Sequence, residues 1–142
     1  MGGGERYGSR IDEATAEFRC GVCGAPAGTV HAARAGEPVE MGPPFEARPM
    51  GSDGVQVIGF LGHAWKAMTP EGYARVLAIL GEPSPDPVAL RGIDPELAPF
   101  YCGACGCSYC LDHWDTETVY DGDIYEHTRG TCPFGHLQLL DN

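Results

Sequence analysis

Cysteine and histidine side chains that could bind a metal ion occur in four closely spaced pairs. Two or three residues separate the members of each pair, so one tight turn can present two side chains to a single zinc ion. Two such pairs complete a tetrahedron of four ligands and leave no open position for water. The sequence therefore predicts two structural zinc sites. Their predicted ligands are Cys20, Cys23, Cys102, Cys105, Cys110, His113, Cys132 and His136.

The remaining cysteine and histidines leave alternatives open. Cys107 is the one cysteine outside the pairs; it could be a nucleophile if a neighbouring cation or base lowered its pKa, but filling a tight hairpin is the simpler role. His127 could replace His113 or His136 as a ligand. Two further histidines are isolated in the sequence and are expected to be structural: His31 and His63.

The rest of the composition favours metal ligation over disulfides. Residues 1–10 are Gly-rich and polar, with no apolar run of the kind a signal peptide needs. No later segment approaches the ~18 apolar residues that span a bilayer. We therefore expect a cytoplasmic protein, and in that reducing setting an odd number of cysteines, 7, points to metal binding.

The run from Tyr101 to Trp114 resembles the central stretch of two-zinc fingers of the treble-clef and RING-related kind. It contains Cys-Gly-Ala-Cys, then four residues that begin with Gly106 and end in Tyr109, then Cys110 and His113. FYVE, AN1 and in-between-RING fingers share this layout. The resemblance implies a small α+β, zinc-stabilised fold. The basic lipid-binding motif of FYVE fingers is absent from the sequence, so phosphoinositide binding is not implied.

The resemblance leaves the pairing of the ligands open. A cross-brace, as in RING and FYVE fingers, would join the first pair to the third and the second pair to the fourth. A sequential arrangement, as in in-between-RING fingers, would join neighbouring pairs. We favour the cross-brace, although the four-residue step before Cys110 occurs in both arrangements.

The long gap between Cys23 and Cys102 predicts an inserted subdomain. We expect a flexible N-terminus over residues 1–15 and one zinc-binding domain over residues 16–142, with the insert at about residues 25–100. Strand signals at 45–50 and 55–60 predict a hairpin, and Thr69-Pro70 with Gly81 predicts a helix between them. The Pro-rich stretch 82–99 is expected to be extended, with one helical turn after Asp94. Asp121-Gly122 predicts a second hairpin.

The charge of the chain restricts its partners. Asp and Glu number 20 against 9 Lys and Arg, for a formal charge of −11. Without a basic cluster, nucleic acid and anionic membranes are not expected as partners. A protein partner is expected, with basic proteins as one class.

These features together favour a zinc-stabilised protein-interaction or adaptor module over an enzyme. The alternatives are an enzyme or its accessory subunit, either ubiquitin-ligase-like or dependent on a cysteine or zinc, and an acidic, immunity-type binder of a basic protein. Fold resemblance alone does not decide among them.

Overall fold

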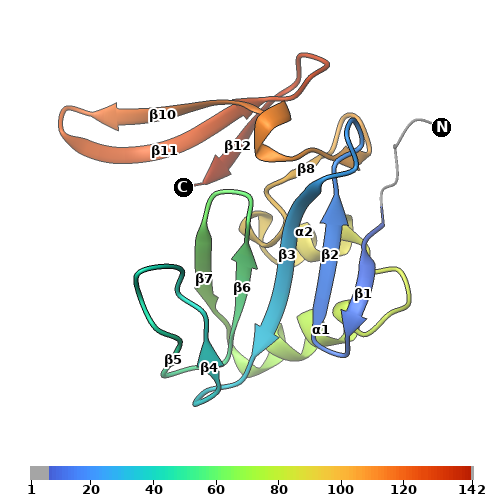
Figure 1. Cartoon of the computed structure of the whole chain (residues 1–142), viewed down its shortest axis with the longest axis vertical. Coiled ribbons are helices and arrows are strands. Elements are labelled where there is room, and N and C mark those ends of the chain that lie inside the picture. The colour runs from blue at the N-terminus through green and yellow to red at the C-terminus, as the bar shows by residue number, and fades with distance from the viewer. Residues whose placement is uncertain (1–6, 142) are drawn as a thin grey trace.

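Antiparallel strands are the main secondary structure of the protein. The computed structural model describes residues 7–141, with 41% of it in strands and 18% in helices. Its largest sheet has five strands in the order β1-β2-β3-β6-β7 (Figure 1). These strands are β1 (Ser9–Asp12), β2 (Thr15–Arg19), β3 (Pro26–Ala33), β6 (Gly54–Ile58) and β7 (His63–Ala67). A short pair, β4 (Pro38–Val39) and β5 (Arg48–Pro49), lies in the loop from β3 to β6.

The centre of the five-stranded sheet is apolar because β3 and β6 are rich in small and β-branched residues. Val30 lies opposite Val57, and Ala32 lies opposite Val55. Val30 and Val55 have no exposed surface. Strand β6 is buried almost throughout.

Two helices follow the sheet and lie behind it in Figure 1: α1 (Pro70–Leu80) and α2 (Pro87–Ile93). Helix α1 begins as predicted, with Thr69 as N-cap and Pro70 in the first turn. It buries Tyr73, Val76 and Leu80 on one side. No helix within residues 7–141 is long and apolar enough to cross a membrane.

The N-cap of α1 gives a first test. The Thr69 hydroxyl oxygen accepts a hydrogen bond from the Gly72 amide at 3.1 Å. Thr69→Ala is expected to lower the free energy of unfolding of the metal-loaded protein by about 1 kcal/mol, because that amide loses its acceptor. Thr69→Ser keeps the oxygen and should stay close to the parent in urea unfolding. Equal stability of both variants and the parent would contradict this role for the cap.

The C-terminal part forms a separate antiparallel sheet above the first one in Figure 1. Its strands are β10 (Asp115–Asp121), β11 (Ile124–Thr131) and β12 (Leu137–Asp141), in that order. A short hairpin of β8 (Tyr101–Cys102) and β9 (Cys107–Ser108) precedes it. Two 3₁₀ turns, η1 (Pro95–Leu97) and η2 (Leu111–His113), complete the chain. Gly122 has a φ of 63° at the turn between β10 and β11. Asp121 pairs with Ile124, so the two loop residues are Gly122 and Asp123, one position later than the predicted Asp121-Gly122.

An aromatic cluster joins the two parts. Phe100 packs against Phe18 of β2, with ring centroids 5.1 Å apart, and against Phe60 at 6.1 Å. Phe60 in turn meets Trp114 edge-on at 6.2 Å. The Trp114 indole donates to the carbonyl oxygens of Phe100 and Tyr109. The core therefore runs without a break from the five-stranded sheet to the start of the C-terminal sheet.

The predicted fold class is wrong. The sequence predicted a small α+β treble-clef or RING-like module with an inserted hairpin-plus-helix subdomain, but residues 7–141 form mainly antiparallel β-structure, in four sheets. The physical reason is that Cys20 and Cys23 lie in the turn between β2 and β3. The segment after that turn therefore continues the sheet begun by β1 and β2.

Three local predictions also differ from the structure. Residues 9–12 form edge strand β1 although residues 1–15 were expected to be flexible; residues 1–6 lie outside the described part. Residues 48–49 pair with β4, and β6 pairs with β3 and β7 instead of with the 45–50 segment. Residues 87–93 form α2, because Asp86 accepts a hydrogen bond from Val88 and Pro87 fits a first helical turn.

Candidate metal centres

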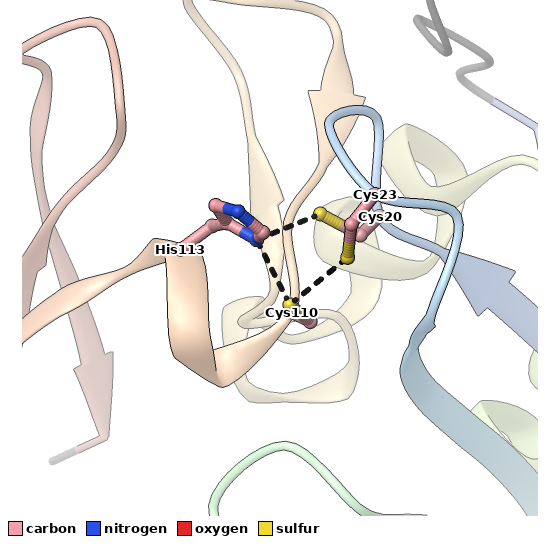
Figure 2. A group of neighbouring side chains, drawn as sticks. All are labelled: Cys20, Cys23, Cys110 and His113. Atoms are coloured by element: carbon pink, nitrogen blue, oxygen red, sulfur yellow. Dashed lines mark hydrogen bonds between the residues drawn. The ribbon is translucent and has the colours of Figure 1, made fainter.

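The first and third ligand pairs come together in one group. Cys20 and Cys23 lie in the turn that follows β2, while Cys110 directly precedes η2 and His113 is its last residue. Their side chains point toward a common centre (Figure 2). The Cys110 sulfur lies 3.7 Å from the Cys23 sulfur and 3.1 Å from Nδ1 of His113, and that nitrogen is 3.5 Å from the Cys20 sulfur.

The second and fourth pairs form an equivalent group. Cys102 and Cys105 lie in the β8–β9 hairpin, and Cys132 and His136 lie in the turn between β11 and β12. The Cys105 sulfur is 3.7 Å from the Cys132 sulfur. Nδ1 of His136 lies 3.3 Å from the sulfurs of Cys105 and Cys132 and 3.8 Å from that of Cys102.

These distances match a tetrahedral zinc ion. With zinc–sulfur bonds of ~2.3 Å, two sulfurs of a tetrahedron lie about 3.8 Å apart, and a sulfur and a nitrogen about 3.5 Å apart. In each group all four ligand atoms lie within 4.8 Å of one another. The sulfur pairs at 3.7 Å are far beyond a disulfide bond, which is ~2.05 Å long. The donor set of three thiols and one imidazole is one that zinc favours.

The backbone of each turn is shaped to hold its sulfurs. Gly24 and Gly106 both have a φ of 75°, and each donates its amide to the carbonyl of the first cysteine of its pair at 2.9 Å. The two turns therefore have the same shape, for which glycine has no steric penalty. Amides also donate to the sulfurs themselves, from Val22 to Cys20 and from Phe134 to Cys132.

The thiols within each group differ in their pKa values. Burial opposes ionisation of Cys20 and Cys132, but backbone amide donors outweigh it and lower both pKa values to about 7. Burial and the neighbouring sulfurs raise the pKa of Cys105 and Cys110 to about 11. Three crowded thiols therefore resist ionising together, and a divalent cation at their centre would remove that repulsion.

A direct link holds the first group to the hairpin of the second. The Gly21 amide donates to the carbonyl oxygen of Ser108 at 2.8 Å. Ser108 belongs to β9, which lies between Cys105 and Cys110 in the sequence. The turn after β2 is thus fixed against the segment that carries ligands of both groups.

The pairing corresponds to the cross-brace alternative. The third pair completes the first group and the fourth pair completes the second, so ligands of the two groups alternate along the chain. Neither group includes His127, which lies on β11 with its Nδ1 3.2 Å from a Glu126 carboxylate oxygen. Nδ1 of His31 and the Thr15 hydroxyl oxygen are hydrogen-bonded at 2.8 Å, which fits a structural histidine. His63 is exposed at the start of β7.

Cys107 lies outside both groups. It is 6% exposed, on β9, within the core that contains Tyr109 and Trp114. Of the two roles considered for Cys107, the position fits the packing of a small residue in a hairpin. No cation lies in the contacts that the structure gives for it.

Tyr109 is a residue that ligand spacing alone did not identify. Burial raises the pKa of Tyr109 far above its usual value, so the hydroxyl keeps its proton and donates to the sulfurs of Cys105 and Cys107. This bond partly offsets the effect of burial on Cys105, whose pKa is still raised. The signal for it was the aromatic residue that ends the four-residue step before Cys110.

The fold and the two Cys₃His groups define a β-rich, zinc-finger-like module with two potential metal sites. The chain belongs to the family described as a domain of unknown function, DUF8328, whose model matches residues 9–142. No curated protein and no solved structure matches the chain.

Proposed function

We propose that this protein is an interaction module whose fold is held together by two structural zinc ions. The observation that carries the proposal is the presence of two complete Cys₃His groups with ligand atoms within 4.8 Å of one another. Four protein ligands complete the coordination sphere of a tetrahedral zinc ion, so neither site would have a coordination position left for water or substrate. The role that fits such sites is structural.

The surface supports a role in binding another protein. Among the described residues, 6 of the 13 exposed large hydrophobic side chains lie between residues 120 and 139. They are Tyr120, Ile124, Tyr125, Phe134, Leu137 and Leu139. Five of them lie on strands β10, β11 and β12, and Phe134 lies in the turn between β11 and β12. Exposed large apolar side chains concentrated in one part of a chain are typical of interaction sites. The C-terminal sheet is therefore the surface that we assign to the partner.

Metal content tests the structural half of the proposal. Protein purified with a reducing agent is expected to contain two zinc ions per chain by elemental analysis. Cys102→Ser should lose one of them, because the second group then has three ligands. The matched control is Cys107→Ser, which removes a nearby buried thiol outside both groups and should keep both ions. A parent protein with fewer than two zinc ions would refute the proposal.

Partner capture tests the interaction half. Tagged, zinc-loaded protein is incubated with extract of the native cells, and Cys102→Ser protein serves as the matched bait. A partner retained by the parent and lost by the variant would support a zinc-dependent interaction surface. Repeated absence of any partner that depends on the zinc-loaded fold would count against an interaction module.

A further inference from the structure

Strand β10 has a free edge. It is the first strand of the β10-β11-β12 sheet, so only its β11 side is paired within residues 7–141. In Figure 1 this strand runs along the margin that faces away from the five-stranded sheet. An edge of this kind presents unpaired amide and carbonyl groups that can hydrogen-bond to another extended chain.

The two faces of β10 carry different side chains. Successive residues of a strand point to opposite faces, so Asp115, Glu117 and Asp121 share one face with Val119. The opposite face carries Thr116, Thr118 and Tyr120, of which Tyr120 packs edge-on against Tyr125 of β11. The irregularity after Val119 falls on β11, where Glu126 has no opposite residue, so the alternation on β10 is unbroken.

This alternation defines the chemistry of a strand that could be added to β10. Opposite charges on adjacent strands attract, so an added strand would place Lys or Arg beside the acidic face. Beside Thr116, Thr118 and Tyr120 it would place β-branched or aromatic residues, which pack well across strands. The segment from 115 to 126 holds five acidic residues and no Lys or Arg. Glu117 is ion-paired at 2.6 Å with Arg129, which lies opposite it on β11, so the selection for basic residues on this face rests on Asp115 and Asp121.

A second copy of this chain does not fit the edge. Pairing β10 with β10 would place the acidic face of one copy beside the acidic face of the other, and like charges on adjacent strands repel. Acidic edge strands are one way in which proteins prevent such self-association. The occupant that remains is a basic segment.

We propose that β10 binds, as a fourth strand of the C-terminal sheet, an extended segment of a partner protein that alternates Lys or Arg with β-branched or aromatic residues. The inference rests on the proposed interaction function and specifies its partner class. Backbone hydrogen bonds to the β10 edge would supply affinity, and the acidic face would select the alternating charge.

The test uses the full-length, zinc-loaded chain and a short blocked peptide in which lysine alternates with threonine and valine. Binding is followed by fluorescence anisotropy at low salt, and amide hydrogen exchange is followed over residues 115–121. The peptide is expected to bind and to slow exchange in β10. Two control peptides keep its charge: one has its lysines grouped together, and the other is N-methylated on its central peptide nitrogens. Both should bind much more weakly.

Protein variants test whether the acidic face of β10 contributes to binding. Asp115→Asn together with Asp121→Asn should weaken binding about fivefold, through loss of two cross-strand charge pairs. The control is Glu46→Gln together with Glu82→Gln, which removes the same charge from exposed positions elsewhere and should change affinity by less than about twofold.

Each contrary outcome has a distinct meaning. Equal binding of the grouped or methylated peptide would overturn the inference, because the hairpin would then be only an acidic surface that attracts any cation. Self-association of the chain through β10, seen by sedimentation, would also overturn it. Zinc content is measured on the same sample: two zinc ions without peptide binding refute the added strand alone, whereas fewer than two refute the proposed function.

Discussion

Removal of zinc is expected to unfold this protein. Structural zinc contributes roughly 10–16 kcal/mol of apparent binding free energy at neutral pH. The net stability of a folded domain is only about 5–15 kcal/mol. Without the ions, six thiols and two imidazoles would be held close together with no cation to balance them. We therefore expect the metal-free chain to lose its fixed tertiary structure.

The measurement is near-ultraviolet circular dichroism during titration with a zinc chelator, in the presence of a reducing agent. The signal of the buried aromatic residues should fall in a cooperative step and return when zinc is added back. Magnesium should not restore it, since it prefers oxygen ligands. Cys107→Ser protein should follow the same course as the parent. A metal-free chain that kept a cooperative thermal transition would show that the two groups do not support the fold.

Phe100→Ala is expected to be the most damaging substitution away from the metal ligands. Phe100 has no exposed surface and lies between Phe18, Phe60 and the backbone of Gly28. A Cβ built on Gly28 would lie 2.5 Å from the Phe100 ring, so the ring rests directly on β3. Truncation should leave a cavity and lower the free energy of unfolding by about 3–5 kcal/mol.

Urea unfolding of zinc-loaded protein gives the measurement. The matched control is Phe45→Ala, which removes the same ring from a side chain that is 70% exposed and should change stability by less than about 0.5 kcal/mol. Zinc content is measured for both variants, because a lost ion would otherwise mimic a core defect. A loss below about 1 kcal/mol for Phe100→Ala, with both ions retained, would contradict the central role of this ring.

The sequence predicted features that depend on residues close together in the chain, such as a helix cap, a turn and the ligand pairs. The predicted helix over residues 70–80 depends on a cap at Thr69, and α1 begins there. Asp121-Gly122 predicted a hairpin, and β10 and β11 meet at this turn. The eight ligand positions followed from pair spacing, and the structure brings them together in two groups.

Strand pairing could not be predicted in the same way. Thr29 of β3 lies opposite Ile58 of β6, a contact between segments far apart in the sequence. Neither segment specifies its partner alone, since both are simply apolar and β-branched. The predicted strand at 45–50 was close in sequence to β6, but its proline, Pro49, and its charged residues suit the short β4–β5 pair better. The resemblance to two-zinc fingers covered the ligand turns and not the sheet around them.

The alternating order of the ligands has a consequence for how the chain is made. The Cys20 sulfur and the His113 ring meet across 93 positions of sequence. A growing chain leaves the ribosome from its N-terminus, so Cys20 and Cys23 emerge long before the residues that complete their group. Cys20 and Cys23 therefore lack their two remaining partners until the chain has been synthesised through His113. Zinc loading is then a late step, and the nascent protein is most vulnerable to oxidation during that interval.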